Sequence, residues 1–290
     1  MRKITLFIKQ KLVACLPDRL FIKRAFKDKQ GYPLNLDNPR TFSEKIQWLK
    51  LYDRKPVYTT MVDKYAVKRY VAERIGEKYV IPTLGVWSHF DDIDFEKLPS
   101  QFVLKCTHDS GGLVICKDKD SLNLQEAKDK INKSLKRDYY KIAREWPYKN
   151  VPRQIIAEKY IEPAANVSDL TDYKWYCFGG EPKYCQVIQN RHIKETIDFF
   201  DTAWNHQEFV GLNPAVGPAT VTPARPNQLD TQIKIAKILS KDIPFSRIDL
   251  YESGSEIYFG EITFYPASGY GKFTPEKYNE LLGDMITLPL

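Results

Sequence analysis

The sequence predicts an α+β fold with antiparallel sheets, because its strand-like segments come mainly as hairpins between amphipathic helices. One hairpin is predicted in residues 172–190, DYKWYCFGGEPKYCQVIQN, with its turn at Gly179-Gly180. A second is predicted in residues 245–265, FSRIDLYESGSEIYFGEITFY, with its turn at Ser253-Gly254. With 43% apolar residues in a chain of 290, there is enough apolar material for a globular core.

Helical patterns account for much of the rest of the chain. Residues 1–60 look helical apart from a turn in residues 31–40, and Thr41 with Glu44 forms a capping-box pattern. The remaining helices are expected at residues 60–75, where Gly76 ends the pattern, and at residues 125–145 and 228–242.

Shorter apolar segments predict the remaining strands. They are expected at residues 79–87, 102–106, 113–118 and 153–162. Residues 211–228 contain four prolines and are expected to form an irregular loop, a candidate lid over a substrate. We therefore expect a helical N-terminal segment (1–60), a central subdomain (61–155) and a C-terminal subdomain (156–290).

Composition and charge narrow the class of protein. No segment approaches the roughly 20 apolar residues that span a bilayer. Five scattered cysteines without a C-x-x-C pair indicate reduced thiols, no structural zinc and a cytoplasmic protein. The net charge of +7 lies within residues 1–30, which hold nine Lys/Arg and two Asp, so the rest is formally neutral and argues against a nucleic-acid partner. This basic segment can either rest on an anionic membrane surface, at the inner face of the membrane, or dock on the protein with its basic face in solvent.

The last predicted hairpin carries the clearest chemical pattern. Asp249 and Glu261 lie on its two strands, twelve residues apart with the turn near the midpoint, so they are expected close together. Alternation places Arg247 on the same face as Asp249. Two facing carboxylates repel unless a cation bridges them, and Mg²⁺ prefers such oxygen ligands. Alone, the pattern is also compatible with a surface hairpin that carries scattered charges.

Residues 102–119, FVLKCTHDSGGLVICKDK, raise the question of why a buried strand ends in Lys105. One interpretation is a hairpin whose lysine reaches solvent. The other is a lysine held at a strand end to contact a phosphate, beside glycines that let backbone N–H groups approach it.

Taken in order along the chain, four segments resemble the ATP-grasp fold, and within it the TupA-like family. They are VDKYAVKRY with Lys64, Lys105 with the Ser110-Gly111-Gly112 turn, AEKYI, and RID…GEITFYPASG. The resemblance runs from about residue 40 to the C-terminus. It implies two antiparallel-sheet subdomains that grip ATP, in amide-forming ligases associated with acidic cell-surface polysaccharides.

The resemblance also implies a role for each matching residue. Lys64 and Lys105 resemble the lysines that contact phosphate, and Lys105 together with Arg247 would act in catalysis. The other positions are the phosphate loop His108, Ser110, Gly111 and Gly112; the adenine contacts Glu158 or the backbone of Lys159 and Ile161; the ribose contact Asp172; and a further phosphate or carboxylate contact, Arg191. Asp249 and Glu261 match the Mg²⁺ ligands.

One position departs from the family pattern. The third metal ligand is commonly an asparagine, and here its place is taken by Thr263, whose hydroxyl is a weaker ligand. The departure puts a second Mg²⁺ in doubt, and it keeps open a non-catalytic polysaccharide-binding protein on an ATP-grasp scaffold. Asp92-Ile93-Asp94 matches the short acidic motif of metal-dependent glycosyltransferases and leaves that class as another alternative.

These observations lead to a hypothesis of function. We expect an ATP- and Mg²⁺-dependent carboxylate–amine ligase that forms an amide through an acyl phosphate. The resemblance implies that the carboxylate belongs to a uronic acid of an acidic polysaccharide, and that the co-substrate is an amino acid or a small amine.

Overall fold

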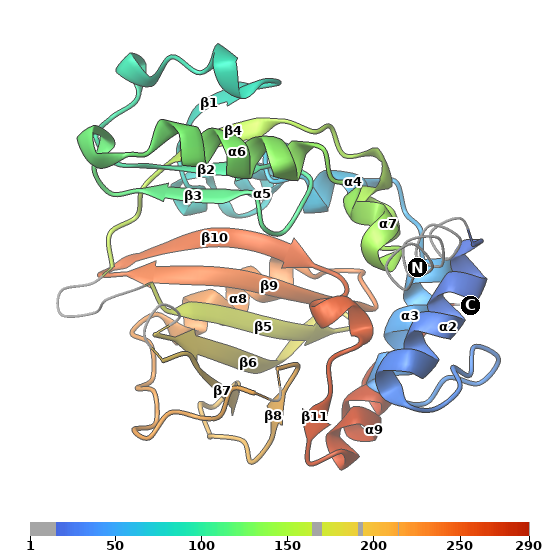
Figure 1. Ribbon diagram of the computed structural model, residues 1–290. Coiled ribbons are helices and arrows are strands. Elements are labelled where there is room, and N and C mark those ends of the chain that lie inside the picture. Colours follow the sequence, from blue (N-terminus) through green and yellow to red (C-terminus); the bar gives the residue numbers. More distant parts are fainter. Residues whose placement is uncertain (1–15, 164–169, 191–193, 214, 290) are drawn as a thin grey trace.

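The computed structural model describes residues 16–163, 170–190, 194–213 and 215–289, and two antiparallel sheets dominate it (Figure 1). The four-stranded sheet has the order β1-β4-β2-β3 and comprises β1 (Thr83–Trp87), β2 (Phe102–Cys106), β3 (Leu113–Cys116) and β4 (Ile155–Lys159). The five-stranded sheet has the order β10-β9-β5-β6-β7 and comprises β5 (Asp172–Phe178), β6 (Glu181–Gln189), β7 (Thr196–Asp201), β9 (Phe245–Ser253) and β10 (Glu256–Thr263). A short pair joins β8 (Val210–Gly211) to β11 (Phe273–Thr274). The predicted α+β class and both predicted hairpins are confirmed.

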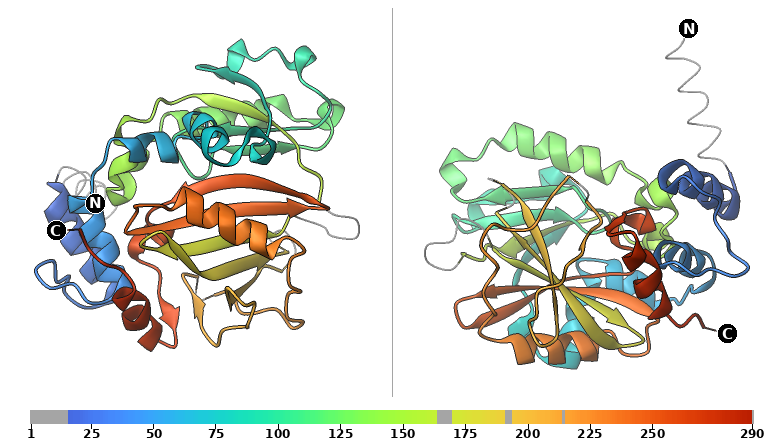
Figure 2. Two further views of the ribbon diagram at one scale, coloured as in Figure 1. Left: turned by 180° about the vertical axis from the view of Figure 1, so that it is seen from behind. Right: turned by 90° about the horizontal axis from the view of Figure 1, so that it is seen from below.

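Helices flank the two sheets. They are α2 (Asp18–Gln30), α3 (Phe42–Tyr52), α4 (Val57–Val62), α5 (Ala66–Ile75), α6 (Leu124–Leu135), α7 (Tyr139–Ala143), α8 (Leu229–Leu239) and α9 (Lys277–Asp284). Helix α6 packs on the four-stranded sheet and α8 on the five-stranded sheet, as Figure 2 shows from behind. The predicted capping box begins α3, with Thr41 and Glu44 bonded to each other's backbone N–H.

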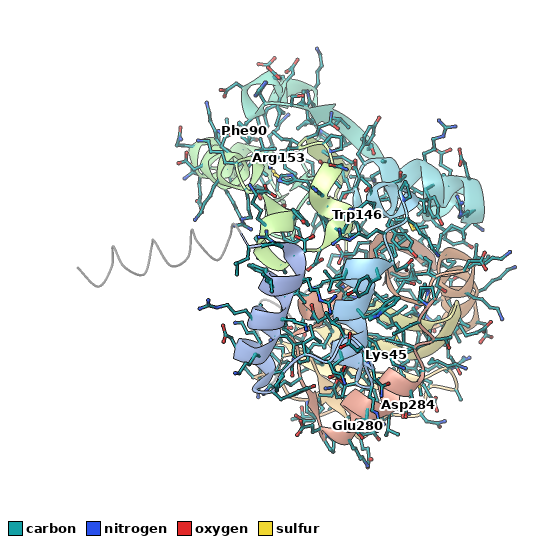
Figure 3. The ribbon with its side chains drawn as sticks, turned by 90° about the vertical axis from the view of Figure 1, so that its right-hand side faces the viewer. Lys45, Phe90, Trp146, Arg153, Glu280 and Asp284 are labelled. Carbon is teal, nitrogen blue, oxygen red and sulfur yellow. The ribbon has the colours of Figure 1, made fainter. Side chains whose placement is uncertain are left out.

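The N-terminal helices join the C-terminal end of the chain. Figure 3 shows Lys45 of α3 close to Asp284 of α9, and the Lys45 Nζ donates a hydrogen bond of 2.9 Å to the carbonyl of Ile286. Helix α2 is anchored through Ile22 and Phe26, both fully buried. Residues 16–52 therefore pack onto the body of the protein.

Each of the two larger sheets has its own hydrophobic core. The smaller lies between α6 and the four-stranded sheet, with Ala127 and Ile131 contributed by the helix. The larger surrounds the five-stranded sheet and includes side chains of α4 and α5, among them Met61 and Val71. The expected boundaries at residues 61 and 156 stay a prediction, but the cores group α4 and α5 with the C-terminal sheet.

The single helix predicted over residues 60–75 is wrong, because the chain breaks between α4 and α5. Asp63 accepts hydrogen bonds from the backbone N–H groups of Tyr65 and Ala66, at 2.8 and 3.2 Å, and so begins a new helix. The N–H of Lys64 donates to the carbonyl of Thr107, at 3.1 Å. The break therefore places Lys64 beside the loop that follows β2.

The long helix predicted over residues 125–145 is also interrupted. Helix α6 ends at Leu135, and the side chain of Asp138 accepts a hydrogen bond from the N–H of Lys141 at the start of α7. After this second break, α7 lies beside the C-terminal end of β10 (Figure 1). Within the described part of the chain, no helix has the length and apolar character required to cross a bilayer.

Candidate functional site

The β9–β10 hairpin brings together the residues predicted to hold a metal ion. Asp249 and Glu261 are direct cross-strand partners, and Arg247 faces Thr263 in the same way. The predicted closeness of Asp249 and Glu261 is thus confirmed. Residues two apart on a strand lie on one face, so Arg247 lies beside Asp249 and Thr263 beside Glu261. Asp249 is 1% exposed, whereas the side chain of Glu261 is 40% exposed.

Arg247 forms the centre of this group. Its Nε and Nη2 donate to the two carboxylate oxygens of Asp249 at 2.6 and 2.7 Å, a bidentate pair. The same Nη2 lies 3.2 Å from the Oε1 of Glu261 and 3.1 Å from the Oγ1 of Thr263. One guanidinium therefore orders both predicted metal-binding carboxylates and the hydroxyl beside them.

A lysine that the sequence analysis missed completes the group. Lys174 on β5 lies directly opposite Asp249 on β9, and its Nζ forms an ion pair with that carboxylate. It also lies 3.9 Å from the Oδ1 of Asp172. The signal was present in the sequence: Lys174 follows Asp172 by two residues, so alternation along a strand places both on one face.

Electrostatics keep Glu261 ionised. Burial alone would raise the pKa of Glu261, but the charges of Lys174, Arg247 and Lys64 outweigh it and lower the pKa to about 2. Within the described residues, no three His, Cys, Asp or Glu side chains are grouped as a metal site. Two carboxylates and a hydroxyl still fit Mg²⁺, which takes one or two carboxylates and fills its shell with phosphate and water oxygens.

Lys64 and the loop after β2 form the opposite wall of the same cavity. The Nζ of Lys64 donates to the carbonyl of Asp109, and Asp109 accepts hydrogen bonds from the N–H of Gly112 and the hydroxyl of Ser134. A Cβ atom added to Gly112 would lie 2.5 Å from the Oγ of Ser134, so a side chain there would disrupt the loop. Asp109 is 1% exposed and orders the loop, a role that no sequence pattern indicated.

Lys105 lies one residue before the end of β2, where its side chain pairs with a buried carboxylate. Glu158 on β4 lies 2.5 Å from Lys105 through Oε2 and 2.5 Å from Lys68 through Oε1. Burial raises the pKa of Glu158, but the two lysines act more strongly and hold it below its usual value. Lys68 was also missed; it lies on α5, in the helix that begins just after Lys64.

These residues enclose two adjoining cavities. The first is polar and is lined by Lys64, Lys68, Lys105, Asp109, Ser110, Gly111, Gly112, Asp172, Lys174, Asp249 and Glu261, among others. The second is largely apolar and is lined by Ile81, Val103, Leu113, Ile115, Lys159, Tyr160, Ile161 and Leu170, among others. The residues that line both cavities are Ile81, Lys105, Leu113, Glu158, Asp172 and Tyr251. A cation-rich cavity continuous with an apolar one matches a nucleotide, whose phosphates are anionic and whose base is flat and apolar.

The remaining predicted residues lie outside this arrangement. His108 is buried, and its Nε2 lies 3.2 Å from the carbonyl of Arg137, so its ring is held against α6 and does not line either cavity. Arg191 lies outside the described residues. Asp94 caps a short turn by accepting from the N–H of Glu96, and it pairs with Lys97 at 3.0 Å, which gives this one residue of the acidic tripeptide a structural role.

Comparison with known proteins connects this geometry to a family. A model of the TupA-like ATP-grasp family matches residues 44–287. No match is found among curated proteins.

Several solved structures are similar at low sequence identity. A D-alanine–D-alanine ligase from Bacillus anthracis complexed with ATP is 18% identical, over 78% of this chain and 63% of its own, with a TM-score of 0.44. A RimK-domain ATP-grasp protein from Sphaerobacter thermophilus is 10% identical, over 81% of this chain and 70% of its own, with a TM-score of 0.44. The ATP-grasp ligase PsnB, complexed with a minimal precursor, Mg and ADP, is 9% identical, over 77% of this chain and 57% of its own, with a TM-score of 0.39. The chain thus spans less than two thirds of the length of the first of these ligases.

Proposed function

Because the chain belongs to the TupA-like ATP-grasp family, we propose that it is an ATP-dependent ligase that joins a carboxylate to an amine through an acyl phosphate. The observation that supports this most directly is the polar cavity, where four cations face two oxygen-donor side chains. The cations that line the cavity are Lys64, Lys68, Lys105 and Lys174, and the donors are Asp249 and Glu261, which Arg247 bonds from outside the lining. Such a set suits a triphosphate that loses its terminal phosphoryl group.

In this proposal, different side chains have different roles in phosphoryl transfer. Lys64, Lys105 and the N–H groups of residues 110–112 hold the phosphates, since cations and backbone donors at fixed positions bind anions without reorganisation. Mg²⁺, when bound by Asp249 and Glu261, neutralises phosphate charge. Arg247 lies between those carboxylates and is placed to stabilise charge on the transferring group and on the acyl phosphate. The apolar cavity, with Lys159 and Ile161, receives the adenine, and Asp172 is proposed to contact the ribose.

The substrate class follows from the family resemblance and from charge. We propose a uronic acid carboxylate of an acidic polysaccharide as acyl donor, and an amino acid or small amine as acceptor. Four lysines and five carboxylates line the polar cavity, so the lysines are in surplus only when Mg²⁺ offsets Asp249 and Glu261. In that state the cavity would favour an acidic substrate, because ATP and a carboxylate both carry negative charge. An acyl phosphate hydrolyses in water, so exclusion of solvent is required during turnover.

We further propose that the protein works at the inner face of an anionic membrane. Helix α2 docks on the protein through Ile22 and Phe26, as in the docked alternative, so the proposal is supported only by the basic residues Lys23, Arg24 and Lys27 on the rest of the helix. The test is co-sedimentation of the full chain with vesicles that contain anionic phosphatidylserine, compared with a variant that replaces the three basic residues by glutamate. Equal sedimentation of both proteins would exclude this surface as the attachment site.

The ligase proposal is tested in two steps that need little knowledge of the substrate. Mg²⁺-ATP should raise the unfolding temperature of the wild type, since a ligand at 100 times its Kd stabilises by about 2.7 kcal/mol. With hydroxylamine present, a suitable carboxylate should then give a hydroxamate, the product of trapping an acyl phosphate. A protein that binds ATP but traps no hydroxamate with any uronic acid would support the non-catalytic alternative, for which the weak ligand Thr263 is the specific observation.

A further inference from the structure

The carboxylate of Asp249, a proposed metal ligand, is already bonded by two cations. Its Oδ1 accepts a hydrogen bond of 2.6 Å from the Nε of Arg247, and its Oδ2 accepts one of 2.7 Å from the Nη2 of the same side chain. The Oδ2 accepts a further hydrogen bond from the Nζ of Lys174. Each carboxylate oxygen offers about two lone pairs, so this Oδ2 has none left for a metal ion. A metal ion can therefore bind it only when one of the two cations moves away.

The strand order places the lysine and the second proposed ligand on opposite sides of Asp249. Strand β9 lies between β5 and β10 (Figure 1). Asp249 is the direct cross-strand partner of Lys174 on β5 and of Glu261 on β10, and all three line the polar cavity. Cross-strand partners have Cβ atoms about 5 Å apart. A metal ion that bridges Asp249 and Glu261 would therefore lie close to the positive charge of Lys174.

Glu261 is held less tightly than Asp249. Its Oε1 accepts hydrogen bonds of 3.2 Å from the Nη2 of Arg247 and 3.1 Å from the hydroxyl of Thr263. Its side chain is 40% exposed, whereas Asp249 is 1% exposed. Glu261 can thus take a metal ion without giving up a short ion pair. The obstacle to metal binding lies at Asp249.

Of the two cations on Asp249, Lys174 is the one that can move. The guanidinium of Arg247 is fixed by its bidentate contact with Asp249 and by its contact with Glu261. Lys174 contacts Asp249 through a single ammonium group on a flexible stem. Its Nζ also lies 3.9 Å from the Oδ1 of Asp172. A small rotation of the stem therefore brings the lysine to a second carboxylate.

We propose that Lys174 is a positioning residue that competes with the divalent cation for Asp249, so that the cation binds tightly only together with a nucleotide. The inference rests on the proposed ATP-dependent function and adds a form of regulation to its metal site. A metal ion that arrives alone meets the charge of Lys174 and must take Asp249 from it. The phosphates of ATP give Lys174 other anionic partners, and they also give the metal ion oxygen ligands.

The charges of the group lead to the same expectation. Lys174 and Arg247 carry two positive charges, which balance the two negative charges of Asp249 and Glu261. A divalent cation alone would add positive charge to a balanced, largely buried group, which is unfavourable. The complex of the cation with ATP carries a negative charge instead. Binding of metal and nucleotide is therefore coupled, and because coupling is reciprocal, the metal strengthens nucleotide binding by the same factor.

The test measures the binding of a metal ion with and without nucleotide. Mn²⁺ is titrated calorimetrically into the full chain, first alone and then with the unreactive analogue β,γ-imido-ATP, and the ratio of the two Kd values measures the coupling. In Lys174→Met, Mn²⁺ alone should bind about tenfold more tightly or better, because one positive charge beside the metal is removed. The ratio of the two Kd values should fall by about the same factor.

Three further variants separate charge from folding. Lys174→Arg keeps the positive charge and should keep the Kd for Mn²⁺ alone within about threefold of the wild type. Asp172→Asn removes the second partner of Lys174 and should weaken the binding of Mn²⁺ alone. Lys68→Met removes a lysine of the same cavity that pairs with Glu158, and should change this Kd by less than about threefold. A cooperative thermal transition in each variant shows that it is folded.

The outcomes distinguish the inference from the function on which it rests. If Mn²⁺ alone bound a folded Lys174→Met no more tightly than the wild type, the competition would be overturned. This holds also if that variant lost nucleotide affinity, because Lys174 would then be a phosphate contact only. If the wild type bound no nucleotide, the proposed ligase function would fail, while the titration with Mn²⁺ alone would still decide whether Lys174 competes for Asp249.

Discussion

Two buried glutamates, Glu158 and Glu145, have nearly equal exposure and opposite electrostatic surroundings. Glu158 is 5% exposed and Glu145 6%. Glu158 lies 2.5 Å from each of two lysines, which hold its pKa below the usual value, whereas burial raises the pKa of Glu145, whose one hydrogen bond comes from a serine. Burial alone therefore does not determine the direction in which the pKa of a carboxylate shifts. Contact with a cation does. The contrast separates the lysine-rich wall of the proposed nucleotide site from a buried carboxylate that contacts no cation within 4.0 Å among the described residues.

The largest expected effect comes from removing one cation of the first region. Lys105→Ala deletes a proposed phosphate contact and leaves Glu158 with Lys68 alone, which makes its surroundings more like those of Glu145. Hydroxamate formation should fall by roughly 10³-fold, and the rise in unfolding temperature with Mg²⁺-ATP should disappear. Lys130→Ala, on the exposed side of α6, is the control. A Lys105→Ala variant with the wild-type thermal shift would remove this lysine from the nucleotide site.

A pair of glutamine substitutions tests the contrast directly. Glu158→Gln leaves two partly buried lysines without their counter-charge and should lower the free energy of unfolding by about 2–3 kcal/mol. Glu145→Gln removes no contacting ion pair and should change it by less than about 1 kcal/mol. Urea unfolding at pH 7 measures both values. Equal losses would mean that the two carboxylates are equivalent supports of the fold.

A smaller effect is expected from strengthening the oxygen-donor set in the nucleotide region. In Thr263→Asn, an amide oxygen replaces a hydroxyl beside Glu261, and amide oxygens are better ligands for hard cations. Mg²⁺ should then bind about tenfold more tightly in the presence of ATP, measured by titrating the thermal shift with Mg²⁺. Thr263→Val should act in the opposite direction. If neither substitution altered the Mg²⁺ dependence, Thr263 would not be a ligand.

The smallest expected effect is a difference in acid stability, measured in EDTA. The pKa of Glu261 is about 2 in the folded protein against 4.5 for the free group, so its contribution to stability is present above pH 4.5 and is lost as the pH falls toward 2. Glu145 has a raised pKa, so it favours the folded state as the pH falls toward 4.5, with the opposite sign. Glu261→Gln should flatten the profile below pH 4.5 by about 1 kcal/mol or less, since the side chain is 40% exposed. If Glu261→Gln lost stability more steeply than the wild type below pH 4.5, the lowered pKa of Glu261 would be contradicted.

Features with local signals were predictable from the sequence. The Gly179-Gly180 turn, the capping box of Thr41 and Glu44, and the pairing of Asp249 with Glu261 depend on residues close in the chain, and the structure confirms each. The second hairpin turns one residue later than predicted, at Gly254-Ser255, where Gly254 has a φ of +61°.

Features that depend on distant contacts were not predictable in the same way. The helix break at Asp63 is stabilised by a hydrogen bond from Lys64 to Thr107, a partner more than forty residues later. Asp109 and Glu145 have no motif around them, because their partners Ser134 and Ser268 come from other elements. Lys174, by contrast, could have been found from its strand spacing to Asp172, a residue already selected.

The hydrogen bond between the N–H of Lys64 and the carbonyl of Thr107 joins the two halves of the nucleotide site. Lys64 precedes a helix that packs with the five-stranded sheet, whereas Thr107 follows a strand of the four-stranded sheet. If ATP enters the proposed site by separation of the two sheets, this bond must break first. The exchange of one amide proton with deuterium, at Lys64, would therefore time the opening of the site in the free protein, and its slowing by nucleotide would measure how firmly the ligand holds the halves together.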